Sequence, residues 1–170
     1  MIPSKSDYHE FYGRYISLVP EEEILPALLA EFERTKCVVE KVPEDLELFV
    51  HDPYKWTVRQ VMSHMIDAER VFADRAHRIS RGDETHLPSF DEMHFAAESG
   101  HAIVPLRRLY EEFAHLRKAN ELLFQNLSEK QWARRGTACN SPVTVSALSY
   151  MMLGHERHHM NIVRKRFKIS

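Results

Sequence analysis

Two histidines, His155 and His159, lie one helical turn apart in a segment that is otherwise apolar along one face. Side chains at positions i and i+4 of a helix have Cβ atoms about 5–6 Å apart, so two imidazole rings can reach one ion. Apolar side chains continue the same stripe on both sides of the pair: Leu148, Met151, Met152, Ile162 and Val163. Imidazoles at core positions cost free energy unless a partner satisfies them, and a bound metal is such a partner. The spacing therefore predicts a metal site inside a helical domain.

A third protein ligand must come from upstream, because residues 160–170 contain no His, Asp, Glu or Cys. Among the upstream histidines, His64 is the best candidate because it lies well inside a predicted helix, beside that helix's apolar face. The other histidines lie near a helix end, face away from an apolar stripe or fall in predicted loops: His9, His51, His77, His86, His94, His101 and His115. Upstream carboxylates are further candidates. Three imidazoles and an open position would be a catalytic arrangement, typical of zinc.

The segment from His155 to His159 also fits the H-E-x-x-H pattern of zinc metalloproteases. That chemistry needs a third ligand downstream, which this chain lacks, so we reject the protease interpretation. Glu156 is then either a general base or a surface glutamate, since it lies about 100° around the helix from His155. His158 is an alternative ligand to His159, but we favour His159 because it continues the apolar stripe.

Four amphipathic helices are predicted to position these residues. The first begins near Pro20, where three glutamates favour a helix N-terminus, and ends before Pro43. The second begins at Thr57, a good N-cap, and ends near Gly82. The third begins near Pro105, and the fourth begins near residues 144–146. Short helical turns are expected over 90–98 and 128–132, and no strand is predicted, since the nearest candidate (residues 142–145) is too short.

Apolar stripes define the face that each helix should bury. In the first helix the stripe is Leu25, Leu28, Leu29, Phe32 and Val39. In the third helix it is Leu106, Leu109, Phe113, Leu116, Asn120, Leu123 and Leu127. Asn120 is the polar interruption, and it either orients a metal ligand or is a buried amide bonded to a neighbouring helix. Four such helices with long second and third connections predict an all-α four-helix bundle with a crossover.

Composition limits the class of protein. A length of 170 residues favours a single domain spanning 1–170, and the net charge of −2 argues against nucleic-acid binding, which needs a cationic face. The two cysteines, Cys37 and Cys139, are expected to be free thiols in a reducing compartment, which predicts a cytoplasmic protein. No signal peptide is visible, and no apolar run is long enough to cross a membrane.

The ordered set of short motifs along the chain resembles the DinB-like (YfiT-type) proteins, often described as metal-dependent hydrolases. The matching stretches are 15–20 (YISLVP), 55–70 (KWTVRQVMSHMIDAER), 81–83 (RGD) with 87–88 (LP), 135–137 (RGT), 142–145 (PVTV) and 154–160 (GHERHHM). The resemblance implies an up-down-down-up bundle and a divalent metal held by one histidine of the second helix and two of the fourth. Those positions are His64, His155 and His159 here. Many members carry a Gln two residues after the last ligand, where this chain has Asn161 or Ile162 depending on alignment, so that role is not carried over.

The resemblance also implies a homodimer and a small-molecule substrate, since some family members are S-transferases that use low-molecular-weight thiols. Zinc is the first expectation for the metal, with nickel, copper, iron or manganese as alternatives. We therefore predict a hydrolase or thiol S-transferase that activates water or a thiol. The alternatives are a non-catalytic, metal-stabilised bundle that binds small molecules or partners, and a hydrogen-bonded histidine cluster without metal. The sequence does not identify a substrate.

Overall fold

Four long helices form the body of the protein. The computed structural model describes residues 2–100 and 103–169. The long helices are α2 (Ile24–Val39), α3 (Val58–Ser80), α5 (Leu106–Gln125) and α7 (Val145–Phe167). Short helical segments complete the set: η1 (Lys5–Asp7), η2 (Glu10–Tyr12), α1 (Gly13–Ile16), η3 (Glu44–Leu46), α4 (Glu92–Glu98) and α6 (Glu129–Trp132). The all-α four-helix bundle expected from the sequence is confirmed.

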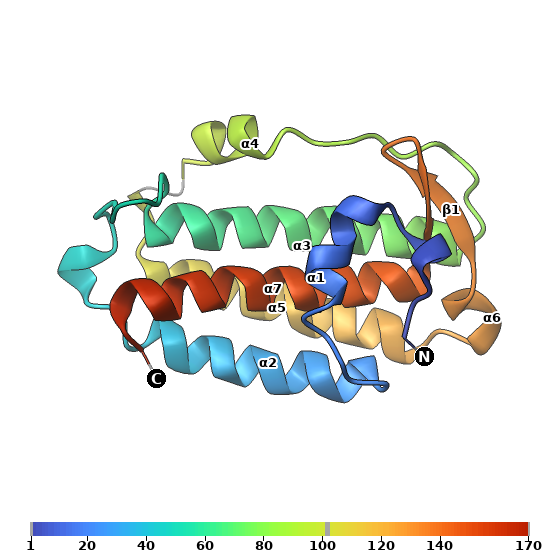
Figure 1. Ribbon diagram of the computed structural model, residues 1–170, viewed down its shortest axis with the longest axis horizontal. Helices are drawn as coiled ribbons and strands as arrows, with labels where there is room; N and C mark the ends of the chain where they lie inside the picture. The colour runs from blue at the N-terminus through green and yellow to red at the C-terminus, as the bar shows by residue number, and fades with distance from the viewer. Residues whose placement is uncertain (1, 101–102, 170) are drawn as a thin grey trace.

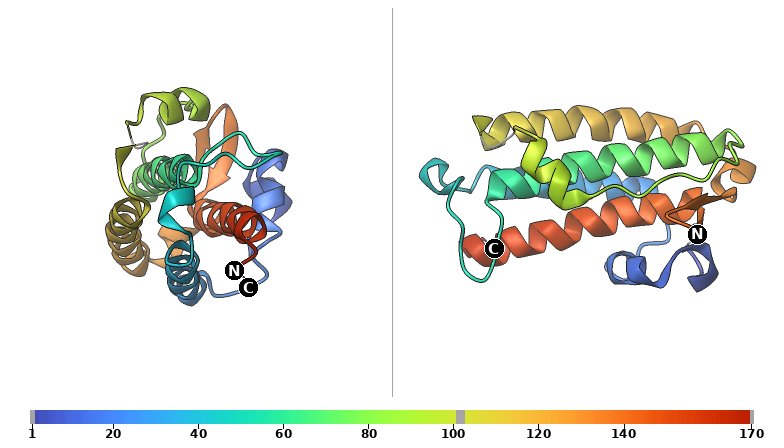
Figure 2. Two further views of the ribbon diagram at one scale, coloured as in Figure 1. Left: turned by 90° about the vertical axis from the view of Figure 1, so that its left-hand side faces the viewer. Right: turned by 90° about the horizontal axis from the view of Figure 1, so that it is seen from above.

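The helices are connected in an up-down-down-up order. Figure 1 shows that α2 and α7 run in one direction, whereas α3 and α5 run in the other. After α3 the chain crosses back along the outside of that helix, through a segment that contains α4. As a result α5 starts at the same end of the bundle as α3 (Figures 1 and 2). Viewed end-on, α2 and α3 occupy opposite corners, and each packs against both α5 and α7 (Figure 2). Side chains of α3 and α7 are therefore direct neighbours.

Local signals account for most helix boundaries. The Thr57 hydroxyl accepts a hydrogen bond from the Gln60 N–H, and the Gln60 side chain accepts one from the Thr57 N–H, which forms a capping box at the start of α3. At the start of α7 the Thr144 hydroxyl accepts a hydrogen bond from the Ala147 N–H. The first helix differs from expectation, because it begins at Ile24 rather than near Pro20. Leu29 of its predicted stripe is exposed, and the helix instead buries the polar side chains Glu31 and Thr35.

The prediction that no strand forms was wrong. Residues Arg135–Ala138 (β1) and Ser141–Thr144 (β2) pair antiparallel, joined by Cys139 and Asn140. Both linking residues have positive φ, 52° and 59°, as the two-residue turn favoured in hairpins requires. The N–H of Leu87 in the crossover donates to the Thr137 carbonyl, so the crossover adds to the edge of this hairpin. Four-residue strands without an Asn-Gly or Asp-Gly turn left no recognisable pattern in the sequence.

The third helix buries a different stripe from the predicted one. Its buried residues are Leu106, Leu109, Tyr110, Phe113, Arg117, Asn120 and Phe124. Leu116 and Leu123 are only partly buried, and Leu127 lies beyond the helix end. The observed stripe follows the i, i+3, i+4 spacing equally well but passes through an arginine, because Arg117 has carboxylate partners inside the bundle.

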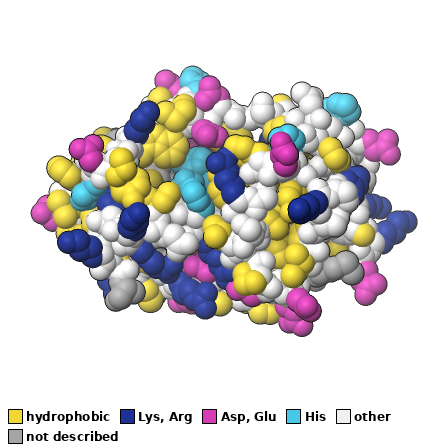
Figure 3. Space-filling view, viewed as in Figure 1, with side chains coloured by type: hydrophobic (Ala, Val, Ile, Leu, Met, Phe, Trp, Pro, Cys, Tyr) yellow, Lys and Arg dark blue, Asp and Glu magenta, His cyan; other side chains and the backbone are white. Residues whose placement is uncertain are grey.

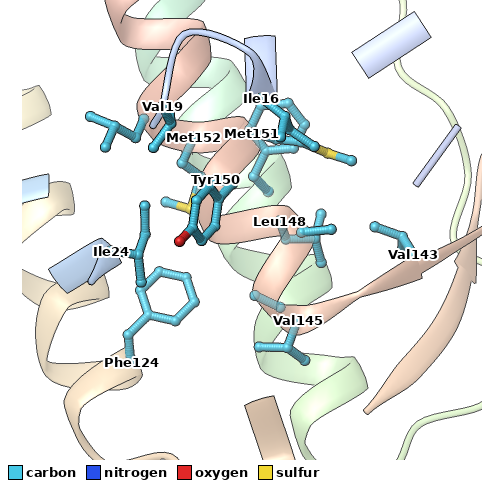
Figure 4. Close-up of a cluster of buried hydrophobic side chains, with 14 of the residues drawn as sticks. Ile16, Val19, Ile24, Phe124, Val143, Val145, Leu148, Tyr150, Met151 and Met152 are labelled. Carbon is cyan, nitrogen blue, oxygen red and sulfur yellow. The ribbon is translucent and has the colours of Figure 1, made fainter. Parts of the chain in front are cut away.

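Two apolar clusters lie towards opposite ends of the bundle, with polar side chains between them. Figure 4 shows the cluster at the hairpin end, where Tyr150 lies near Ile24 of α2 and Phe124 of α5. The buried Tyr150 hydroxyl donates hydrogen bonds to the carbonyl oxygens of Glu21 and Glu22, at 2.7 and 3.1 Å. This contact ties the segment before α2 to the second turn of α7. Within the described residues, no helix is both long and apolar enough to cross a membrane.

The aromatic N-terminal arm, residues 8–16, packs on α7 through α1 (Figure 1). Gly154 permits this packing, since a Cβ atom at that position would lie 2.1 Å from the carbonyl oxygen of Tyr15. An atom cannot occupy that space unless the arm moves away from the helix. The absence of a side chain at position 154 therefore determines how closely α1 approaches α7.

Gly154→Ala is expected to destabilise the protein by about 1–3 kcal/mol, because the clash with backbone outweighs the roughly 1 kcal/mol by which Ala favours a helix interior. Gly13→Ala is the matched control, since a Cβ there would have its nearest neighbour at 3.8 Å. Urea unfolding of both variants measures the difference. A Gly154→Ala protein as stable as the control would contradict the close packing of the arm.

Candidate metal centre

Three buried histidines converge between α3 and α7. The Nε2 atom of His155 lies 2.9 Å from Nε2 of His64 and 3.1 Å from Nε2 of His159. Each of the three residues offers one ring nitrogen, and these three atoms all lie within 4.8 Å of one another. Each side chain is less than a tenth exposed. The structure thus brings together the three histidines that sequence spacing selected, and the described residues contain no other such group of possible metal ligands.

Burial keeps the three imidazoles neutral. Desolvation, with a smaller contribution from His158, lowers the pKa of His64 to about 4. Burial and then the neighbouring histidines lower the pKa of His155 and of His159 well below the usual value. Neutral imidazoles present the nitrogen lone pairs that metal ions bind, so no proton has to be removed at neutral pH before a cation enters.

The separations of the nitrogens fit a shared cation. An ion bound to two imidazole nitrogens at about 2.0–2.1 Å, with an angle near 90–110° between the bonds, holds them about 2.9–3.4 Å apart. The Nε2–Nε2 distances from His155 to His64 and to His159, 2.9 and 3.1 Å, fall in this range. Hydrogen bonds between the rings explain both short separations poorly. Nε2 of neutral His155 carries either one proton or one lone pair, so it can form such a bond with only one of its two neighbours. The donor set therefore fits a divalent cation.

Aromatic side chains surround the histidines. The Tyr15 ring packs edge-on against His155 and His158, with centroids 5.3 Å apart in both pairs. The Trp56 ring lies 5.0 Å from that of His64. Nδ1 of His64 is buried and has no hydrogen-bond partner among the described residues. Histidine side chains reach the surface near the middle of the face shown in Figure 3. The rings of Tyr15 in α1 and of Trp56 in the connection before α3 thus lie against the centre.

Of the two neighbouring histidines on α7, His159 and not His158 lies in the group of three. The His159 ring belongs to the group of three, whereas His158 is half-buried beside it, with ring centroids 5.0 Å apart. The two histidines differ by about 100° around the helix, and only the His159 direction faces α3. Sequence reasoning missed Tyr15 and Trp56 as neighbours of the centre, because a four-residue helix and a connecting segment are too short to carry a periodic signal.

Both interpretations of Glu156 were wrong. Its side chain is buried and points in a different direction from His155, about 100° around α7, where one oxygen accepts from the Arg117 guanidinium at 2.7 Å and the other from the Thr35 hydroxyl at 2.7 Å. Burial raises the pKa of Glu156, although Arg117 and Thr35 act in the opposite direction. A carboxylate held in this way is neither on the surface nor available to the metal centre as a base.

Arg117 connects this carboxylate to the next helix. Its guanidinium also donates two hydrogen bonds to Glu69 of α3, at 2.8 and 3.0 Å. The Asn120 amide donates to the same carboxylate at 3.0 Å, so Asn120 is a buried amide bonded to a neighbouring helix and does not contact a histidine. Together with Thr35 these residues form a network that joins all four long helices directly beside the histidines. We call it the central ion network.

The chain matches the family model of the DinB superfamily over residues 27–163. Among solved structures it is similar to YfiT from Bacillus subtilis, described as a probable metal-dependent hydrolase with an unusual four-helix bundle topology. The two share 19% identity and a TM-score of 0.71, covering 99% of this chain and 94% of that one. It is also similar to a mycothiol-dependent maleylpyruvate isomerase, with 14% identity, a TM-score of 0.68, and 86% of this chain and 61% of that one covered. These structural likenesses show the fold, and no curated protein matches the chain.

Arg117→Met is expected to destabilise the protein by about 3–5 kcal/mol, because it leaves two buried carboxylates without their cation. Arg70→Met is the control: Arg70 pairs with Glu112 at the surface, and loss of an exposed pair costs at most about 1 kcal/mol. Chemical denaturation of both variants gives the comparison. Equal losses would show that the central ion network does not stabilise the bundle as described.

Proposed function

Because the chain belongs to the DinB superfamily, we propose that it is a metal-dependent enzyme in which His64, His155 and His159 hold one divalent cation. The observation that carries the proposal is the convergence of three neutral ring nitrogens from two helices. Imidazole donors suit zinc first, with nickel, copper, iron or manganese as alternatives. The chain is expected to act as one domain over residues 1–170.

When bound, the cation would serve as a Lewis acid towards water or a thiol at the position that three protein ligands leave open. The chain's own residues prepare that position. The rings of Tyr15 and Trp56 limit the access of bulk water, and burial raises the pKa of Tyr15, so its phenol stays protonated and is available to a substrate as a hydrogen-bond donor. His158 is half-buried next to the group and outside it, and we assign it to proton transfer with the substrate.

The names of the structural neighbours support metal-dependent chemistry and the use of a thiol. One neighbour is described as a probable metal-dependent hydrolase, and the other is an isomerase that depends on a low-molecular-weight thiol. We propose that this chain is a hydrolase or thiol S-transferase with a small-molecule substrate. The further expectations that it acts as a homodimer and in the cytoplasm rest on the resemblance and on its two free cysteines.

A second function is supported by the burial of the histidines. All three are less than a tenth exposed and lie next to the central ion network, where a metal would also stabilise the helix packing. In that case the protein is a non-catalytic, metal-stabilised bundle that binds small molecules or partners. The two functions differ in whether an external ligand reaches the metal.

Metal binding is tested by His155→Ala, which removes the histidine that contacts both others. We expect its zinc affinity to fall by more than the 10–100-fold that is typical of losing a supporting residue. His158→Ala should retain the metal, because its ring lies outside the group, and His77→Ala is a control with an exposed histidine on α3. Metal analysis after dialysis, with competition by a chelator, provides the measurement. Equal metal content in all three variants rules out the assigned ligands.

Catalysis is tested with cobalt-loaded protein and added 2-mercaptoethanol. An accessible metal should show a new thiolate-to-cobalt charge-transfer band, whereas a closed structural site should not. In parallel, zinc-loaded protein is assayed for thioester hydrolysis and for thiol conjugation to an electrophile. We expect one of these activities to require the metal and to be lost in His155→Ala but kept in His77→Ala. A metal-bound protein with neither the band nor turnover supports the non-catalytic alternative.

A further inference from the structure

Arg75 carries a buried charge that no carboxylate neutralises. Its side chain is only 4% exposed on α3, under the hairpin. The guanidinium donates to the Pro88 carbonyl oxygen at 2.6 Å and to the Cys139 sulfur at 3.2 Å, and it also contacts the Tyr12 hydroxyl. Burial raises the pKa of Tyr12, so the phenol is neutral. These partners satisfy hydrogen bonds, but none of them is a carboxylate.

The contrast with Arg117 is informative, because these are the two buried arginines of the described residues. Arg117 has two carboxylate partners, Glu69 and Glu156. Within the same described part of the chain, Arg75 forms no ion pair with any acid. A guanidinium removed from water without a counter-charge is strongly unfavourable, so a buried cation of this kind calls for an anion from outside.

A cavity beside Arg75 offers the space for such an anion. It has a volume of about 210 Å³ and lies between the N-terminal arm, the hairpin and the first turns of α7. Apart from Arg75, Cys139 and a few polar groups, its lining is apolar, with Phe11, Val143, Leu148 and Met151 as the larger contributors. The cavity thus combines one buried cation with an apolar wall.

We propose that this cavity binds a small organic carboxylate, whose carboxylate group pairs with the Arg75 guanidinium and whose apolar body packs against the arm and the hairpin. Planar guanidinium and carboxylate groups match each other with two parallel hydrogen bonds, which favours this class over a halide. The site lies outside the metal centre: Arg75 is eleven residues after His64 on one helix, which is about 16 Å along its axis. The proposal therefore stands independently of any metal.

Cys139 provides a direct readout, since its sulfur lies at hydrogen-bond distance from the guanidinium. Iodoacetate is a small carboxylate that alkylates thiols, and iodoacetamide is its neutral analogue. In both reactions the thiolate sulfur forms a bond to the CH₂ carbon, the carbon–iodine bond breaks and iodide leaves, while the thiol proton passes to the buffer. The ratio of the two rates cancels the ionised fraction of the thiol and reports only the preference for the anionic reagent.

We expect the ratio of iodoacetate rate to iodoacetamide rate to be about tenfold higher at Cys139 than at Cys37, as one contact to a charged group would produce. Cys37 is exposed on α2 and serves as a control within the same molecule. Arg75→Gln should abolish the preference at Cys139 and leave Cys37 unchanged, whereas Arg75→Lys should retain part of it. Peptide mass spectrometry over time measures all four rates.

A second measurement needs no variant and covers the case in which Arg75→Gln fails to fold. Benzoate should slow alkylation of Cys139 by iodoacetamide in the unaltered protein, while benzamide, its neutral isostere, should not. The proposal is overturned if the ratio of iodoacetate rate to iodoacetamide rate is the same at Cys139 and Cys37. Arg75 would then show no preference for an added carboxylate, as expected if the Cys139 sulfur is its counter-ion. It is equally overturned if benzoate and benzamide protect Cys139 to the same extent.

Discussion

Buried polar side chains need partners, and this requirement governs the middle of the bundle. Between the two apolar clusters, each long helix contributes a hydrogen-bonding or charged side chain to the central ion network, which Arg117 completes by pairing with Glu69 and Glu156. Removing such groups from water is costly unless geometry and charge are both satisfied. The helices can meet these demands in few relative rotations, so the network restricts how α3 and α7 present their other faces to each other.

The metal centre depends on that restriction. Glu156 and His155 are adjacent on α7 and point in different directions, one into the network and the other towards His64 of α3. A rotation of α7 that moved the histidines apart would also pull Glu156 away from Arg117. The crossover topology contributes as well, because it places α3 beside α7 rather than beside α2 (Figure 2). The ion pairs and the order of the helices thus place the three imidazoles together. Hydrogen bonds between the rings would hold them less well, because Nε2 of His155 can serve only one neighbour at a time.

Charge balance separates the two polar regions of the protein. The central ion network contains acids that pair with Arg117, so it needs no further ion. The three histidines are neutral and suit a cation. At the hairpin, by contrast, Arg75 is buried without a carboxylate partner, next to a cavity and the Cys139 sulfur. One helix therefore carries two chemically different sites: lone pairs that suit a cation near its start and a positive charge that suits an anion near its end.

Local sequence determined the helices, the caps at Thr57 and Thr144, and the pairing of His155 with His159, because these depend on contacts within a few residues. The local sequence also pointed to His64, since a histidine beside an apolar stripe is expected to face the interior. The hairpin, the burial of Glu156 and Arg117 and the isolation of Arg75 were decided only by the tertiary structure. Each of these depends on which side chain lies opposite on another helix or loop. A periodic pattern shows that a face is buried, but it does not specify its partner across the bundle, and for a charged side chain the partner decides whether burial is tolerated.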